Sequence, residues 1–446
     1  MQPLALACIR RGGATVISDV HRPYYSAMRP IFSLLGLSLG WFFGTMPAIA
    51  ATPTAAPVVD APAPPYRAPY EPTRDDEVLQ VVPATTDPAV ARMTNLRKAL
   101  SATPHDLPAA ISLATAYVDY GRQVGDAHYA GYAEAVLAPW LAGPSVPGPV
   151  LLTEATILQY RHQFPEARKL LHEVLSADPG SAQAWLTLAT LDMVQGDYAA
   201  AGKECVQVTS TADVALGLAC SANLRSYTGH ARQSLALLAQ VEAGTGAQSP
   251  GYRAWIHGLM AEAAERLGDW PLAETHYRAA LELLPRDNFL LVSYADFLLD
   301  RSRPREVLAL LADAVQSDTA FLRIALAQAA LHSTDTARYS WIMAARFAAL
   351  TARGSDFFGR EQARFALELQ HDPQTALDLA RKNWQVQREP WDTRLLLAAA
   401  LAAREPGAVS DVLEFRQRVN LEDPIVEAIV QDLRTVGDTT LAGAKP

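Results

Sequence analysis

The chain has 446 residues, of which 50% are hydrophobic and 19% are charged, and its formal net charge is −9. An acidic chain without a stripe rich in lysine and arginine is expected to bind neither nucleic acid nor anionic lipid. Aromatic residues make up only 8% of the chain, while alanine and leucine are abundant, which favours close-packed helices over sheets.

The N-terminal region has the pattern of a secretory signal peptide. An apolar run at residues 31–43 follows Met28-Arg29-Pro30, and Ala48-Ile49-Ala50 provides a cleavage site of small residues. We therefore predict a leader at residues 1–50 that is cleaved after Ala50, and an exported, periplasmic protein. Two alternatives stay open. The first concerns the start of translation, which is either Met1 or Met28. The second is that the leader stays attached as an uncleaved anchor, because residues 31–51 are uncharged and just long enough to span a bilayer.

The next segment has the composition of a linker. Residues 51–88 contain nine prolines and many alanines, and little in this segment can pack, so we predict a disordered, proline-rich linker there. Helical periodicity begins at about Ala89. We predict a helical repeat domain at residues 89–435 and a flexible tail at 436–446, with no membrane span in the mature chain.

The clearest helical unit lies at residues 249–286. Gly268 permits the backbone conformation that ends a first helix, and Asp269 is a good N-cap for a second. Pro285 closes the unit, because the residue before a proline disfavours the α region. Small and large side chains recur at helical spacing at Ala261, Ala264, Ala273, Tyr277, Ala280 and Leu281.

Copies of this unit recur along the chain. Residues 151–179 carry one, and the next, with Gly196-Asp197-Tyr198 as its turn, is shifted by 34 residues. A weaker copy surrounds Gly229, another follows at residues 291–315, and beyond it the pattern degrades. The pattern resembles the tetratricopeptide repeat (TPR), a 34-residue helix–turn–helix. This resemblance implies an all-α, TPR-like α-solenoid, a right-handed superhelix of about nine helix pairs.

The same resemblance implies a site. In TPR proteins the first helix of each pair lines a concave groove, and this carries over here by position, so we expect protein or peptide partners. Acidic residues gather towards the C-terminal half of the predicted lining, which favours a basic or extended partner segment. The predicted lining residues are Thr115, Asp119, Thr156, Gln159, Tyr160, Thr190, Asn223, Tyr227, Glu262, Glu265, Arg266, Asp296 and Asp300.

Catalytic and metal-binding motifs are missing from the sequence. It has no HExxH, G-x-S-x-G, P-loop or GxGxxG pattern, and its ten histidines are scattered. We predict no enzyme activity, no cofactor and no metal. Two cysteines remain if Cys8 leaves with the leader. Cys205 and Cys220 fall on neighbouring helices, so we predict a disulfide for an exported chain, with two buried free thiols as the alternative.

Three functions are compatible with these observations. The first is an exported TPR scaffold that binds partner proteins in an envelope assembly. The second is the periplasmic TPR component of a polysaccharide-export or cytochrome-assembly machine, where similar solenoids occur. The third is an enzyme with an unrecognised site, for which the degraded segment at residues 317–359 is the place. The missing motifs favour the first.

Overall fold

The computed structural model describes residues 87–443 except 212–213, 245–247 and 354–358, with side chains as far as residue 436. The predicted leader at residues 1–50 and the predicted linker as far as residue 86 lie outside the described residues. Within them every regular element is a helix, as the sequence predicts. No helix in this part of the chain is both long enough and apolar enough to cross a bilayer.

The helices follow one another as pairs between two single helices, α1 (Pro88–Ala102) and α20 (Pro424–Gly443). The described residues hold nine pairs. They are α2 (Leu107–Val124) with α3 (His128–Leu141), α4 (Gly148–Tyr160) with α5 (Phe164–Ala177), α6 (Ala182–Gln195) with α7 (Tyr198–Thr211), α8 (Val214–Tyr227) with α9 (Ala231–Ala243), α10 (Pro250–Arg266) with α11 (Trp270–Leu283), α12 (Asn288–Asp300) with α13 (Pro304–Leu310), α14 (Asp318–Ala330) with α15 (Thr336–Ala352), α16 (Gly359–Glu368) with α17 (Pro373–Trp384), and α18 (Pro390–Ala403) with the short η3 (Pro406–Val409) and α19 (Ser410–Val419).

The turn inside each pair contains one residue with a positive φ. In the unit at residues 249–286 this is Gly268, with φ at 70°, and the Asp269 carboxylate then accepts from the backbone N–H of Leu272 as the predicted N-cap. Non-glycine residues take the left-handed position in five pairs, although this conformation costs them about 1–2 kcal/mol each. The residues at this position are Gly125, His162, Gly196, Gly229, Gly268, Ser302, His332, His371 and Arg404.

These turns show that the helix pairs continue where the repeat pattern fades after residue 315. The three pairs beyond it have a side chain at the left-handed position, as the recognised copies with His162 and Ser302 also do, so the turn geometry is kept without glycine. His332 and His371 are two such residues, and both are exposed. The helix pairs therefore continue to the C-terminal end of the repeat region.

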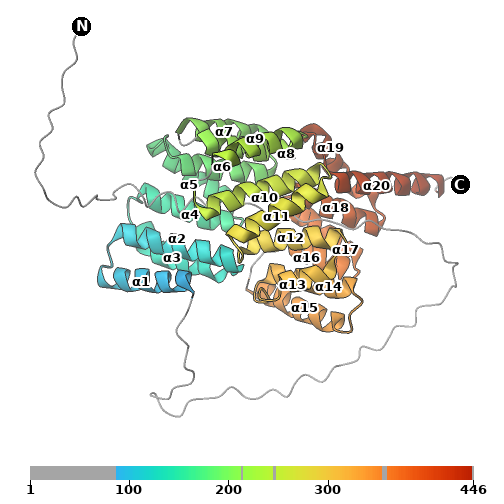
Figure 1. Cartoon of the computed structure of the whole chain (residues 1–446), viewed down its shortest axis with the longest axis horizontal. Coiled ribbons are helices and arrows are strands. Elements are labelled where there is room, and N and C mark those ends of the chain that lie inside the picture. The colour runs from blue at the N-terminus through green and yellow to red at the C-terminus, as the bar shows by residue number, and fades with distance from the viewer. Residues whose placement is uncertain (1–86, 212–213, 245–247, 354–358, 444–446) are drawn as a thin grey trace, which may run out of the picture.

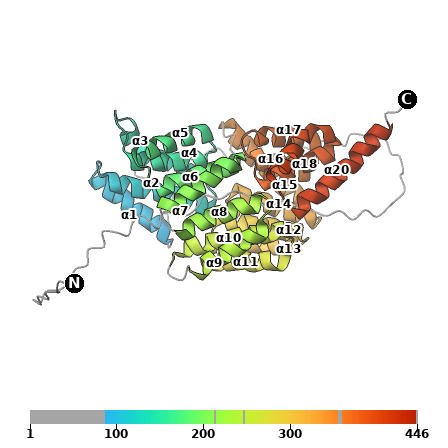
Figure 2. The same ribbon diagram turned by 90° about the horizontal axis from the view of Figure 1, so that it is seen from above.

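The stacked pairs close on themselves, so pairs far apart in the sequence meet. Gly125, at the end of α2, lies against Asn288 and Ser317, where a Cβ would come within 2.4 Å of Ser317 Oγ. The Arg388 backbone N–H, just before α18, donates to Val194 O at 2.7 Å. Hence the first pair contacts the sixth and seventh, and the third pair contacts the ninth. Figures 1 and 2 show the C-terminal helices packed beside the middle of the chain.

A large hydrophobic cluster joins these distant parts. It combines side chains of α6 to α10 with side chains of α16 to α20. Tyr198, at the start of α7, packs on Phe415 of α19 with ring centroids 6.0 Å apart, and Phe415 meets Trp384 of α17 at 5.3 Å. The C-terminal helix α20 packs on α18 and continues past residue 436, where the sequence predicted a tail, and no proline lies between Pro424 and Gly443 to interrupt it.

Candidate partner-binding site

The predicted groove residues all lie on the first helix of their pair, but the structure buries most of them. Thr115, Asp119, Thr156 and Tyr160 are half-buried. The other nine are between 0% and 7% exposed: Gln159, Thr190, Asn223, Tyr227, Glu262, Glu265, Arg266, Asp296 and Asp300. The expectation of an open, solvated groove at these nine positions is therefore wrong, because later helices of the same chain cover them.

Asp296 on α12 is the centre of the covered region. Its carboxylate accepts from Arg323 Nε at 3.0 Å and Arg323 Nη2 at 2.7 Å, and it also binds Arg364 Nη1 on α16. Burial alone would raise the pKa of Asp296, but the two guanidinium groups outweigh it and hold the pKa below its ordinary value. The basic partner expected for this acidic residue thus comes from the chain itself.

The ninth pair supplies two more contacts of this kind. Arg394 on α18 donates to Asp300 Oδ1 at 2.9 Å. Arg360 on α16 binds Asp392 with Nε and Nη2 and Glu389 with Nη2, each at 2.7 Å. All five side chains are buried. These charge-assisted hydrogen bonds fix where α16 and α18 lie relative to each other and to α12.

A second group of charges lies between α8 and α10. Arg266 donates to Ser226 Oγ at 3.0 Å, and its guanidinium carbon lies 4.7 Å from the centre of the Tyr227 ring. Burial raises the pKa of Glu262 to about 7, even though Arg266 at 3.5 Å partly offsets the effect. Burial raises the pKa of Glu265 further, to about 8, and its Oε1 has no hydrogen-bond partner among the described residues.

Sequence reasoning missed the four arginines that cover the groove. Arg323, Arg360, Arg364 and Arg394 all lie on first helices of the last three pairs, and each is at most 3% exposed. A weak signal for them exists along the first helices. Those of the seventh to ninth pairs carry these arginines, whereas Asp296 and Asp300 lie on that of the sixth.

A hollow of about 40 Å³ still reaches one of the predicted groove residues. Its lining includes the buried Glu262, Trp255 and Leu290 and the half-buried Asp287 and Phe289. Gly258 also lines it, where a Cβ would lie 3.4 Å from Leu290 Cδ2. The remaining lining residues are Arg122, Gly251, Ala254, Leu259 and Leu284. The lining is therefore mostly apolar, with three charged residues from α2, α10 and the start of α12.

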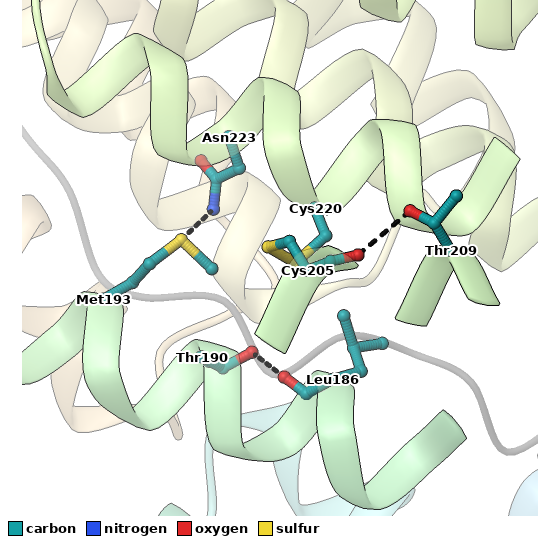
Figure 3. The surroundings of a disulfide bond; sticks show 7 residues. All are labelled: Leu186, Thr190, Met193, Cys205, Thr209, Cys220 and Asn223. Carbon is teal, nitrogen blue, oxygen red and sulfur yellow. Dashed lines mark hydrogen bonds between the residues drawn. A yellow bond between two sulfur atoms is a disulfide. The ribbon is translucent and has the colours of Figure 1, made fainter. Parts of the chain in front are cut away.

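A disulfide joins Cys205 of α7 to Cys220 of α8, with the Cα atoms 5.5 Å apart. Both residues are fully buried. The two helices approach closely because position 217 is glycine, where a Cβ would come within 2.0 Å of Thr209 Oγ1. Figure 3 shows the disulfide beside Met193, whose sulfur accepts from Asn223 Nδ2 at 3.7 Å. Asn223, a predicted groove residue, is thus directed into the core.

Metal-binding clusters are not found in the part of the chain that the structure describes, where no three His, Cys, Asp or Glu side chains are placed around one point. His257 and His276 form the closest histidine pair described, with Nδ1 atoms 3.2 Å apart. Glu242 lies 3.3 Å from the Nε2 of His257. One imidazole ring donates a hydrogen bond to the other, so the pair is explained by its contact in the fold and needs no bound metal.

Comparison with known proteins identifies the repeats. The tetratricopeptide repeat family model matches residues 159–214. No curated protein sequence matches the chain. A similar solved structure is a tetratricopeptide repeat protein from Parabacteroides merdae, with 13% identity over 65% of this chain and 97% of that one and a TM-score of 0.34. Human IFIT1, solved as a dimer with m7Gppp-AAAA, has 12% identity over 74% of this chain and 86% of its own, with a TM-score of 0.42. Yeast Tom70 has 10% identity over 80% of this chain and 93% of its own, with a TM-score of 0.34.

Proposed function

We propose that this tetratricopeptide-repeat chain is an exported scaffold that binds a partner protein at the hollow beside Glu262. Tetratricopeptide repeats in general mediate contacts between proteins. The observation that carries the proposal is the hollow itself, which is lined by residues of the first helices α2, α10 and α12 and by the buried Glu262, a predicted groove residue. The covered residues around Asp296 hold the scaffold together and are not the partner site.

The chemistry of the hollow favours a partner segment with an apolar side chain next to a basic one. Trp255, Leu259 and Leu290 provide an apolar interior for the first. Asp287 offers a half-buried carboxyl group to a lysine or arginine of the partner, whereas Glu262 is already paired with Arg266. An extended segment suits a hollow that is open at one edge.

The disulfide supports export. Disulfides persist in oxidising compartments and are rare in the cytosol. The Cys205–Cys220 bond and the signal-peptide pattern at residues 1–50 agree on an extracytoplasmic location, and the periplasm of a bacterium is the compartment that we propose.

Site-specific photo-crosslinking in the native cell tests the proposal. A photoreactive phenylalanine analogue at Phe289 is expected to capture a defined partner, whereas the same analogue at the exposed Val206 on α7 captures none. Gly258→Leu fills the hollow and is expected to reduce capture from position 289 at least tenfold. Equal capture from positions 289 and 206, or capture that Gly258→Leu does not change, contradicts the partner site.

The same samples test export. N-terminal sequencing of the isolated protein is expected to give Ala51 as the first residue. An intact leader on a protein found in the cytosolic fraction contradicts the compartment, independently of what the hollow binds.

A further inference from the structure

Four tyrosines form a cluster on the first helix pair. Tyr117 and Tyr120 come from α2, and Tyr129 and Tyr132 come from α3. The ring centroids of Tyr120 and Tyr129 are 4.9 Å apart, and those of Tyr129 and Tyr132 are 5.6 Å apart with their planes at 87°. Tyr132 is 55% exposed, so its ring is available at the surface of the cluster.

The described chain begins at this cluster. Asp87, the N-cap of α1, lies with its Oδ2 3.5 Å from the Tyr120 hydroxyl. The residues that precede Asp87 are therefore joined to the described chain at a point beside the tyrosine rings. They include the sequence PAPPYRAPYEP at residues 62–72, which has five prolines in eleven positions.

We propose that the tyrosine cluster is the docking surface for this chain's own proline-rich segment, residues 62–72. Proline-rich segments favour the extended polyproline II conformation, and proteins that bind them do so with grooves lined by aromatic rings. Tyrosine suits this role because its ring packs on the pyrrolidine ring while its hydroxyl donates to a backbone carbonyl that has no partner within the segment. Tyr132 is exposed and Tyr120 and Tyr129 are half-buried, so these three rings reach the surface of the first pair.

The covalent link makes a weak contact sufficient. Only 14 residues, 73–86, separate the segment from Asp87. A chain of that length reaches at most about 50 Å when extended, and a short flexible linker gives an effective concentration in the millimolar range. Proline restricts the backbone of any chain that contains it, so a proline-rich sequence loses little conformational entropy when it binds. The same surface in a chain without the linker has no such advantage.

Crosslinking within the full-length chain tests this contact. Tyr132 is replaced by a photoreactive phenylalanine analogue, and equal amounts of unlabelled and 15N-labelled chains are mixed before irradiation. Mass mapping is expected to find the main crosslink between position 132 and residues 62–72. The crosslinked peptides are expected to be wholly unlabelled or wholly labelled, which shows that both ends belong to one molecule.

A pair of proline variants provides the control. Replacement of Pro62, Pro64, Pro65, Pro69 and Pro72 by alanine is expected to lower this crosslink at least fivefold, while replacement of Pro53 and Pro57 leaves it unchanged. Circular dichroism of both variants verifies that the helical domain is intact. Crosslinks from position 132 to any other segment, mixed-label crosslinks as the main product, or an unchanged yield in the five-proline variant would overturn the proposal.

Discussion

Arg394 Nη2 lies 2.9 Å from Asp300 Oδ1, although 94 residues separate the two in the sequence. This contact joins the sixth helix pair to the ninth inside the superhelix. Both side chains are at most 7% exposed. We therefore expect Arg394→Met to lower the free energy of unfolding by about 3–5 kcal/mol, because it leaves a buried carboxyl group without its partner. Urea unfolding followed by circular dichroism measures the change.

The double variant Arg394→Met with Asp300→Leu is the matched control. A buried ion pair contributes little net stability compared with apolar residues of similar size, so the double variant is expected to recover most of the loss. A double variant that is as unstable as Arg394→Met alone would show that the guanidinium acts through other contacts, such as its 5.7 Å approach to the Trp391 ring.

The buried glutamates predict an unusual dependence of stability on pH. Burial raises the pKa of Glu265 to about 8 in the folded chain, well above its value in the unfolded chain. Such a group stabilises the fold at low pH and loses this contribution as the pH rises towards the folded pKa. We expect the free energy of unfolding to fall between pH 5 and pH 8.

The variant Glu265→Gln tests this dependence. It removes the titrating group, so its urea midpoint is expected to change less between pH 5 and pH 8 than that of the wild type. Glu282→Gln, at an exposed position on the neighbouring α11, is expected to keep the wild-type slope. Identical slopes in all three proteins would place the titration elsewhere.

The architecture could be predicted from the sequence, but its closure could not. The turn at Gly268-Asp269 has a local chemical signature, and its copies at Gly196 and Gly229 gave the repeat spacing and the all-helical solenoid. The position of the groove residues on first helices follows from the same spacing. Glu262 and Asp296 are buried because the superhelix turns far enough for distant helix pairs to meet. No local sequence pattern determines how far the superhelix turns.

The arginines were hidden for a related reason. An arginine on an amphipathic helix is usually solvated, so Arg323 and Arg364 look like ordinary surface residues in the sequence. Only the three-dimensional structure, in which both arginines contact Asp296, identifies them as its buried partners. The disulfide was easier to foresee, because both cysteines lie on helices that are neighbours in the sequence.

Gly229 provides a test of the closure. Its φ is +72°, and a Cβ would come within 2.0 Å of Asn420 Nδ2 and 2.7 Å of the Asn420 carbonyl oxygen. Gly268 has a similar φ of +70°, but a Cβ there meets nothing nearer than 3.6 Å. Gly268→Ala is thus expected to cost about 1–2 kcal/mol from backbone strain alone. Gly229→Ala is expected to cost clearly more, and thermal unfolding compares the two. Equal costs would show that the segment after α19 does not hold the fourth pair.

Reduction of the disulfide is expected to destabilise the chain. The bond closes a loop with a sequence separation of 15 residues, for which loop-closure entropy gives about 3 kcal/mol. Urea unfolding with and without a phosphine reductant measures the effect. A variant with alanine at both Cys205 and Cys220 is expected to have the free energy of unfolding of the reduced wild type, with or without reductant. If the reductant also lowers the free energy of unfolding of this variant, the effect has another cause than the disulfide.

The closure of the superhelix also determines how the molecule folds and unfolds. In an open solenoid each repeat contacts only its neighbours, so repeats can fray from the ends one after another. Here the first pair is held by the sixth and seventh, and the third by the ninth, so a terminal pair cannot leave without breaking contacts in the middle of the chain. We expect a single cooperative unfolding transition and slow folding, because the contacts between Asp300 and Arg394 and between Val194 and Arg388 join residues that are 94 and 194 positions apart in the sequence.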